Sequence, residues 1–227
     1  MRARLIAALG LSAAALPAAA NAADWSSDLS LVSDYRYRGV SLSGEKPALQ
    51  GTADVELKSG AYGELWVSTI KDDGAGKLEL DGSAGYAFDL ADGISLDVSA
   101  TYYLYPGHVS SNAHEFTVVV EGTHGPFTAS LGASVAPPQR GTRDDDDRRR
   151  TNLYLFGVAG YAVKNTPLTL RAQIGREQGP WDMRERGSKW DYALGLQAGF
   201  ERAKVSLDLV GSNAGSDGLV ASAALRF

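Results

Sequence analysis

The sequence of 227 residues contains no cysteine, which excludes disulfide bonds as a source of stability. It also has no run of eighteen apolar residues, so it predicts no membrane-spanning helix. Basic residues are outnumbered, with 22 Lys and Arg against 27 Asp and Glu. Because nucleic-acid affinity depends on neutralising phosphate charge, this balance argues against a nucleic-acid partner. HExxH and glycine-rich phosphate-binding motifs are absent as well, and we expect no metal and no cofactor.

The first 22 residues are typical of a secretory signal peptide that is removed on export. Arg2 and Arg4 form a basic start, residues 5–16 are apolar, and Ala20-Asn21-Ala22 forms a small-x-small cleavage site. We therefore expect a signal peptide over residues 1–22 and a single mature domain over residues 23–227. An exported chain without disulfides must be stabilised by its fold alone.

The C-terminal residues carry a clear strand pattern. Apolar side chains occupy every second position from Leu219 to Phe227, and the other phase becomes polar toward Arg226. A period of two places one set of side chains on each face of a β-strand. We expect no later segment to cover the apolar face, and a lipid bilayer is a solvent that accepts such a face. The pattern therefore favours a transmembrane β-barrel.

The same period predicts twelve strands, centred on residues 28–38, 48–58, 61–71, 77–89, 94–105, 114–122, 126–136, 152–163, 168–177, 188–200, 204–212 and 218–227. The prolines beyond residue 22 fall in connections or at strand starts, as expected for a sheet without free edges. Short and long connections alternate, which is typical of outer-membrane barrels with short periplasmic turns and longer extracellular loops. The predicted fold class is an all-β, transmembrane, antiparallel up-and-down β-barrel of about twelve strands.

Aromatic residues of the apolar phase indicate which face contacts lipid. A soluble barrel shows the same alternation with its apolar phase inside, and its large rings would lie centrally. Here the rings lie at strand ends, which favours two girdles at the membrane interfaces. The predicted interface aromatics are Trp25, Phe88, Phe127, Tyr161, Phe200 and Phe227 at the periplasmic ends, and Tyr35, Tyr37, Tyr102, Phe116, Trp190 and Tyr192 at the outer ends.

The polar phase then faces the lumen and supplies candidate pore-lining residues. They are Asp34, Arg36, Arg38, Asp54, Glu56, Glu64, Glu79, Asp81, Asp97, Arg171, Lys189, Asp191 and Asp208. Carboxylates predominate in this set, and rings of carboxylate in a water-filled pore favour cations. Alternatively, acids and bases pair across a narrow interior and stabilise the barrel. Twelve strands lie between eight, whose interior is filled, and sixteen, whose channel is open.

Two further lumen features leave alternatives open. Arg36 and Arg38 either bind an anionic solute group or form an ion-pair ladder with neighbouring carboxylates, and we favour the ladder. Five aromatic residues fall on the lumen phase: Trp66, Tyr103, Tyr105, Tyr154 and Phe156. They narrow the lumen, stack a sugar or aromatic solute, or mark a register that is shifted by one residue.

The opening of the predicted barrel resembles a known family. Residues 31–41 (LVSDYRYRGVS), 45–51 (EKPALQG), 59–62 (SGAY) and Trp66 are similar to the start of the TorF-family porins, outer-membrane proteins of Gram-negative bacteria without a well-defined substrate. The resemblance is most specific over residues 31–70. It implies a β-barrel and suggests a pore, but no ligand and no catalytic set. The last strand, ending in Phe227, resembles the signal that the barrel-assembly machinery recognises.

Two other features give weaker signals. The acidic run in residues 143–150 (RDDDDRRR) lacks the alternating spacing and the turn glycine of a Ca²⁺ site. Its arginines suit lipopolysaccharide phosphates, and a solvated, mobile loop is the simpler interpretation. His114 is expected on the lipid-facing phase near the outer rim, with no serine two residues away, so a lipid-modifying enzyme has little support.

We therefore expect a bacterial outer-membrane channel, exported through the periplasm, that passes small hydrophilic solutes by passive diffusion with a weak cation preference. A non-conducting structural or surface-binding barrel is the alternative, and an outer-membrane lipid-modifying enzyme is a remote third. The expected partners are outer-membrane lipids, lipopolysaccharide, the barrel-assembly machinery and the solutes themselves.

Overall fold

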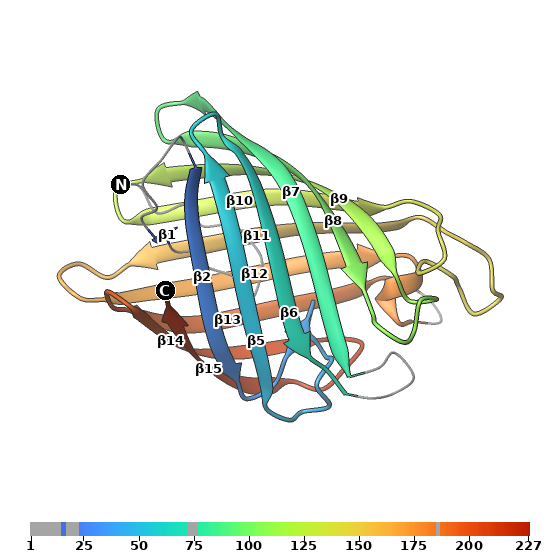
Figure 1. The fold of residues 1–227 in the computed structure, drawn as a ribbon. Coiled ribbons are helices and arrows are strands. Elements are labelled where there is room, and N and C mark those ends of the chain that lie inside the picture. The colour runs from blue at the N-terminus through green and yellow to red at the C-terminus, as the bar shows by residue number, and fades with distance from the viewer. Residues whose placement is uncertain (1–14, 17–22, 72–76, 185–186) are drawn as a thin grey trace.

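The computed structural model describes residues 15–16, 23–71, 77–184 and 187–227, and twelve of the described strands form a closed antiparallel barrel (Figure 1). In chain order these are β2 (Ala23–Val32), β5 (Ala48–Leu57), β6 (Ala61–Thr69), β7 (Leu78–Ala91), β8 (Ile94–Leu104), β9 (Ala113–His124), β10 (Phe127–Ala136), β11 (Asn152–Ala162), β12 (Leu168–Gln178), β13 (Lys189–Gly199), β14 (Ala203–Ser212) and β15 (Gly218–Arg226). The other described elements are β1 (Ala15–Leu16), β3 (Arg36–Tyr37), β4 (Val40–Ser41) and the 3₁₀ turn η1 (Pro180–Asp182).

Each barrel strand pairs with the next one in the chain, and the last pairs with the first. β15 lies antiparallel to β2, with Arg226 opposite Asp28 and Ser222 opposite Val32. This pairing closes the sheet, so its backbone N–H and C=O groups have partners without an exposed edge. In the described part of the chain, no helix has the length and apolarity needed to cross a bilayer.

The two ends of the barrel differ. Short turns over residues 58–60, 92–93, 125–126, 163–167 and 200–202 join the strands at one end, which we call the turn end. Longer connections over residues 33–47, 105–112, 137–151, 179–188 and 213–217 join them at the other, which we call the loop end. The predicted alternation of connections is confirmed.

The first strand begins earlier than its sequence pattern predicts. The prediction places it at residues 28–38, whereas β2 runs from Ala23 to Val32. Its last pair with β5 is Val32 opposite Ala48; Ser33 still donates its N–H to the carbonyl of Ala221 on β15 (2.8 Å), and the chain leaves the wall after it. The predicted signal peptide lies outside the described residues except for Ala15 and Leu16, which pair with the start of β2.

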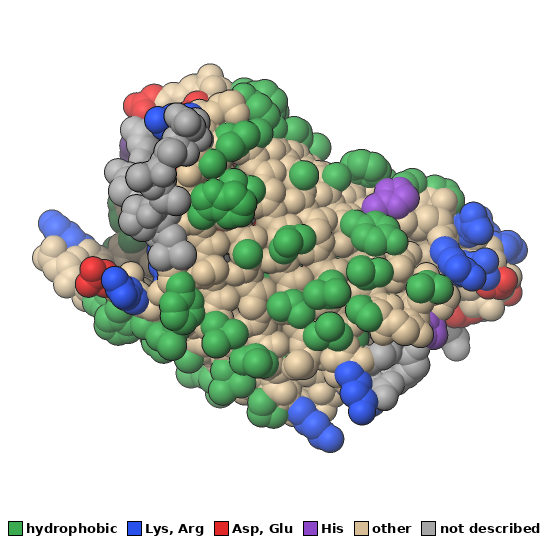
Figure 2. Space-filling model, in the orientation of Figure 1, with side chains coloured by type: hydrophobic (Ala, Val, Ile, Leu, Met, Phe, Trp, Pro, Cys, Tyr) green, Lys and Arg blue, Asp and Glu red, His purple; other side chains and the backbone are tan. Residues whose placement is uncertain are grey.

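The apolar phase of the strands faces outward. Leu65 and Leu131 have exposed fractions of 68% and 74%, values that suit lipid rather than water contact. Figure 2 shows hydrophobic side chains spread over the wall, with the charged side chains of this face toward its ends. Nine of the predicted interface aromatics are exposed on the outer surface of the barrel: Trp25, Phe88, Tyr102, Phe116, Phe127, Trp190, Tyr192, Phe200 and Phe227. Tyr161 is partly covered by Phe127.

Two of the predicted interface aromatics differ from that expectation. Tyr35 is buried against Trp66 inside the barrel, and the Tyr37 hydroxyl lies 3.1 Å from the hydroxyl of the inward-facing Tyr103. The sequence pattern places both residues at the outer end of the first strand. Because that strand already ends at Val32, their alternation continues in a segment that folds inward.

Candidate functional site

The interior at the loop end is filled by the connection between β2 and β5, which we call segment 33–47. Connections ordinarily run over the surface, yet Asp34, Arg36 and Arg38 are buried here. β3 and β4 form a small hairpin in this segment. Arg38 and Gly39 at its tip both have positive φ, 47° and 81°, as in a two-residue type I′ turn.

Arg38 connects this hairpin to two parts of the barrel wall. Its Nη2 donates to Glu115 Oε2 on β9 (2.7 Å), and its Nη1 donates to Glu177 Oε1 on β12. Lys189 on β13 pairs with the other oxygen of Glu177 at 2.5 Å. Glu177 is fully buried and Lys189 is 1% exposed. Charges at this depth require such pairing, because an unpaired buried charge is strongly destabilising.

A second ionic cluster lies within the segment itself. Arg36 Nε donates to Asp34 Oδ2 (2.6 Å), and the hydroxyls of Ser41 and Ser43 donate to Asp34 Oδ1 (2.6 and 3.0 Å). The Arg36 guanidinium also donates to the backbone carbonyl of Ser216, in the connection before β15. Arg36 and Arg38 therefore both bind groups of the protein, and segment 33–47 is held from several sides.

The lumen-phase aromatic residues lie inside the barrel at the loop end. Trp66 packs edge-on against Tyr35, with ring centroids 5.2 Å apart, and Tyr154 stacks on Phe156 at 5.3 Å. The Tyr105 hydroxyl donates to Glu79 Oε1 (2.7 Å). The interpretation of a shifted register is wrong: β6 and β11 are paired over their length with these rings pointing inward.

Glycines make room for these rings. A Cβ on Gly175, which lies on β12 beside β11, would come 2.5 Å from the ring of Tyr154. A Cβ on Gly132, on the other side of β11, would overlap the ring of Phe156. The rings therefore lie flat over neighbouring strands and narrow the lumen.

The interior toward the turn end is lined by separated charges. Carboxylates project from β5 to β8, where Asp54 accepts from Ser26 (3.3 Å) and Asp97 accepts from Tyr62 (3.0 Å). Cations project from the opposite run of strands, where Arg171 pairs with Asp208 at 2.6 Å. The remaining candidates Glu56, Glu64, Asp81 and Asp191 lie on the same inward phase as these groups, and the Asp191 carboxylate accepts from Tyr154 (2.9 Å).

Several interior residues were not among the sequence-derived candidates. Glu177 and Lys204 share the alternation of Arg171 and Asp208 on their own strands, so the period of two was sufficient to find them. Trp181 lies in η1, and its indole donates to the carbonyl of Gly141 (2.8 Å) while its ring meets that of Tyr103. Polar and apolar residues do not alternate regularly in that connection, so the sequence does not predict where Trp181 lies.

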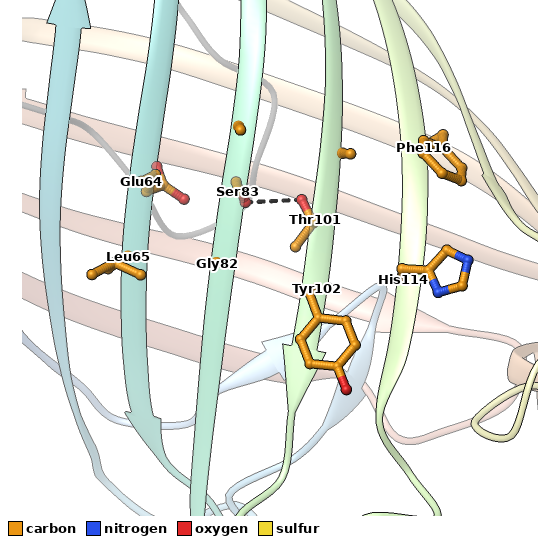
Figure 3. Close-up of a pocket in the computed structure, with 10 residues that line it drawn as sticks. Glu64, Leu65, Gly82, Ser83, Thr101, Tyr102, His114 and Phe116 are labelled. Carbon is orange, nitrogen blue, oxygen red and sulfur yellow. Dashed lines mark hydrogen bonds between the residues drawn. The ribbon is translucent and has the colours of Figure 1, made fainter.

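A shallow depression on the lipid-facing wall lies outside this interior. Figure 3 shows it over β6 to β9, where small residues such as Gly82 are flanked by Leu65, Tyr102, His114 and Phe116. The Ser83 hydroxyl is hydrogen-bonded to Thr101 (2.9 Å). His114 N–H donates to Gln139 Oε1 (2.8 Å), and Gln139 Nε2 donates to the His114 carbonyl (2.7 Å). This arrangement shows no serine–histidine pair among the described residues.

The charged segment 143–150 forms a closed hairpin tip. Asp144 accepts from the backbone N–H groups of Asp146 (3.1 Å) and Arg148 (2.8 Å) and from the Arg150 side chain (3.0 Å). Arg143 pairs with Asp147 at 2.5 Å. Asp144, Asp146 and Asp147 are thus bound by arginines of the same segment. No group of three or more His, Cys, Asp or Glu side chains in the described ranges is arranged to hold a metal ion.

The chain matches one protein family over most of its length. Residues 17–224 match Gcw_chp, described as a bacterial protein of unknown function. The chain belongs to the Gcw_chp family. No curated protein matches this Gcw_chp chain in sequence.

Solved structures show the same fold. The Gcw_chp barrel is similar to the KdgM porin, with a TM-score of 0.64 and 10% identity over 89% of this chain and 99% of that one. It is similar to the NanC porin, with a TM-score of 0.59 and 10% identity over 88% and 97% of the two chains. An outer membrane channel from Pseudomonas putida F1 gives a TM-score of 0.57 and 13% identity over 98% and 100%. The closed twelve-strand barrel is thus an outer-membrane porin fold.

Proposed function

We propose that this Gcw_chp protein is a bacterial outer-membrane channel that passes small hydrophilic solutes by passive diffusion. The observation that carries the proposal is the inversion of polarity across one wall. Leu65 on β6 is 68% exposed on the outside, while its neighbours Glu64 and Trp66 point inward. A closed sheet that is apolar outside and charged inside suits a bilayer around an aqueous interior. The porin folds of the similar structures support the same conclusion, and we propose no catalytic role.

We further propose that the channel has a weak preference for cations. Asp54, Glu64 and Asp97 line one side of the interior toward the turn end, and Asp81 continues that side toward the loop end. On the other side Arg171 is already paired with Asp208. Because unlike charges cancel locally, the excess of carboxylate sets the sign of the potential that a small ion meets.

Planar-bilayer recording of the purified barrel tests both statements. Stepwise currents are expected, with a reversal potential in a salt gradient that indicates cation preference. Substitution Asp54→Asn together with Glu64→Gln should move the reversal potential toward zero, while Asp92→Asn at the turn end outside the lumen serves as the matched control. Anion preference in the unmodified protein would contradict the charge assignment and leave the channel role intact.

A non-conducting barrel is the second candidate, because one observation favours it. Segment 33–47 fills the interior at the loop end, and its central residues are buried. In that case the outer connections carry the function and the interior only stabilises the fold. A barrel that stays electrically silent after removal of segment 33–47 would support this candidate.

The remaining expectations complete the proposal. The resemblance to TorF-family porins stays a prediction, since the family match is to Gcw_chp. We propose that the strand ending at Phe227 is recognised by the barrel-assembly machinery. We propose that the exposed aromatic side chains at the strand ends contact lipid, and that the arginines of the loop end contact lipopolysaccharide.

A further inference from the structure

We propose that segment 33–47 is a latch, which closes the loop end while Arg38 is bound to Glu115 and Glu177 and opens when these ion pairs release. This inference concerns the regulation of the same lumen and rests on the proposed channel function. It makes Arg38 the residue that sets how often the channel is open.

The first argument is that the segment reaches the wall on several sides. Tyr35 packs on Trp66 of β6, and Tyr37 meets Tyr103 of β8. Arg38 binds carboxylates on β9 and β12. The hairpin tip reaches β14, where a Cβ on Gly39 would lie 2.5 Å from the carbonyl oxygen of Gly211. Contacts to β6, β8, β9, β12 and β14 extend around most of the barrel, so the segment spans the lumen.

The second argument is that the wall is complete without the segment. β2 and β5 pair continuously from Ala23 opposite Leu57 to Val32 opposite Ala48. Segment 33–47 is therefore suspended from a hairpin whose ladder is already closed. Its departure from the lumen breaks no hydrogen bond between β2 and β5; beside the Arg38 ion pairs it gives up the bond from Arg36 to the Ser216 carbonyl and the backbone bond from Lys71 N–H to Leu42 C=O (2.8 Å).

The third argument is that both carboxylates keep partners after release. Glu177 retains Lys189 at 2.5 Å and the Asn152 side chain, which donates to it at 3.0 Å. Glu115 retains the Tyr103 hydroxyl at 3.0 Å. The open state thus leaves neither carboxylate without a partner. Glu177 keeps a cation and Glu115 keeps one hydrogen bond, and two arrangements in which both carboxylates have a partner are what a bistable element requires.

Arg38 itself occupies an unusual conformation. Its φ of 47° lies in the left-handed region, which few residues other than Gly, Asn and Asp adopt readily. The tight turn places its guanidinium over the Tyr154 ring, 4.0 Å from the centroid. The local strain is offset only while the ion pairs and this stacking are made, so their loss favours departure of the hairpin.

The experiment compares single-channel recordings of four forms of the full-length barrel. They are the unmodified protein, Arg38→Met, a deletion in which residues 33–47 are replaced by the type I′ turn Asn-Gly, and the matched control Arg140→Met, an exposed arginine of the loop end. Heat-modifiable migration on gels establishes that each form is folded. We expect the open fraction of Arg38→Met to rise at least about tenfold, the deletion to stay open, and the control to match the unmodified protein.

The outcomes separate the latch from the channel. Should the deletion and the unmodified protein conduct alike, the latch is overturned and the channel stands. Should the folded deletion pass no current, the channel itself is overturned. An opened deletion with an unchanged Arg38→Met would remove Arg38 as the residue that holds the latch and so overturn the proposal as stated. If the deletion does not fold, Glu115→Gln with Glu177→Gln replaces it, and unchanged gating there has the same consequence.

Discussion

Arg38 and Tyr154 form a stacked pair inside the barrel, with the guanidinium carbon 4.0 Å from the ring centroid. The same tyrosine donates its hydroxyl to Asp191 Oδ1 at 2.9 Å. One ring on β11 thus supports the hairpin tip through its face and the β13 wall through its edge. The two interactions belong to different chemical groups of one side chain and can be separated by substitution.

Substitution Tyr154→Phe should lower the free energy of unfolding by about 1–3 kcal/mol, because a buried carboxylate loses a hydrogen bond. Tyr154→Leu should lower it by about 2 kcal/mol more, because the desolvated cation–π contact with Arg38 is lost as well. Urea unfolding in detergent micelles measures both, and Tyr161→Phe on the outer wall is the control. Equal values for Phe and Leu would show that the stacking contributes nothing.

The buried pair of Lys189 and Glu177 supports a second prediction. Lys189→Met should destabilise the barrel by about 3–5 kcal/mol, because it removes one cation from a fully buried carboxylate. Adding Glu177→Gln should recover part of that loss, since the uncompensated charge is then gone. Lys164→Met, in an exposed turn, is the matched control. Strictly additive effects in this double-mutant cycle would contradict the pairing.

The third prediction concerns the glycines that leave room for the lumen-facing rings. Gly175→Ala should lower the free energy of unfolding by about 1–3 kcal/mol, because the new Cβ would come 2.5 Å from the Tyr154 ring. Gly199→Ala on β13 should be nearly neutral, because nothing lies within 4 Å of its Cβ position. Both substitutions are compared by the same urea titration. A similar loss at both positions would indicate a general cost of replacing glycine in these strands.

The strands could be predicted from the sequence because polar and apolar residues alternate along them. Ile94, Leu96 and Val98 alternate with Ser95 and Asp97, and a period of two fixes which of them face lipid. The same rule places Glu79 and Asp191 inside the barrel. Any residue on a regular strand, Glu177 included, is within reach of this argument.

The sequence pattern did not predict that segment 33–47 fills the lumen at the loop end. Tyr35 and Tyr37 continue the alternation of β2 past its end, so the pattern extended the strand instead of ending it at Val32. What ends the strand is the inward turn of a segment whose partners lie far along the chain, such as Glu115 and Glu177. Contacts of this kind have no local period, and a single sequence does not report them.

The hairpin tip at residues 143–150 gives the last prediction, which concerns pH. Desolvation opposes ionisation of Asp144, but hydrogen bonds from the Arg148 backbone and from the Arg150 and Arg148 side chains together outweigh it and lower the pKa to about 2, below the usual 3.8. Because the hydrogen bonds favour the ionised form of Asp144, its contribution to the stability of the tip is complete above pH 3.8. This contribution is lost as the pH falls through about 2. A nitroxide at Asp145→Cys, in a chain without other cysteines, should therefore stay ordered at pH 4 and become mobile near pH 2. In an Asp144→Asn background its spectrum should be mobile at both values. Loosening that begins above pH 4 would show that Asp144 does not hold the tip.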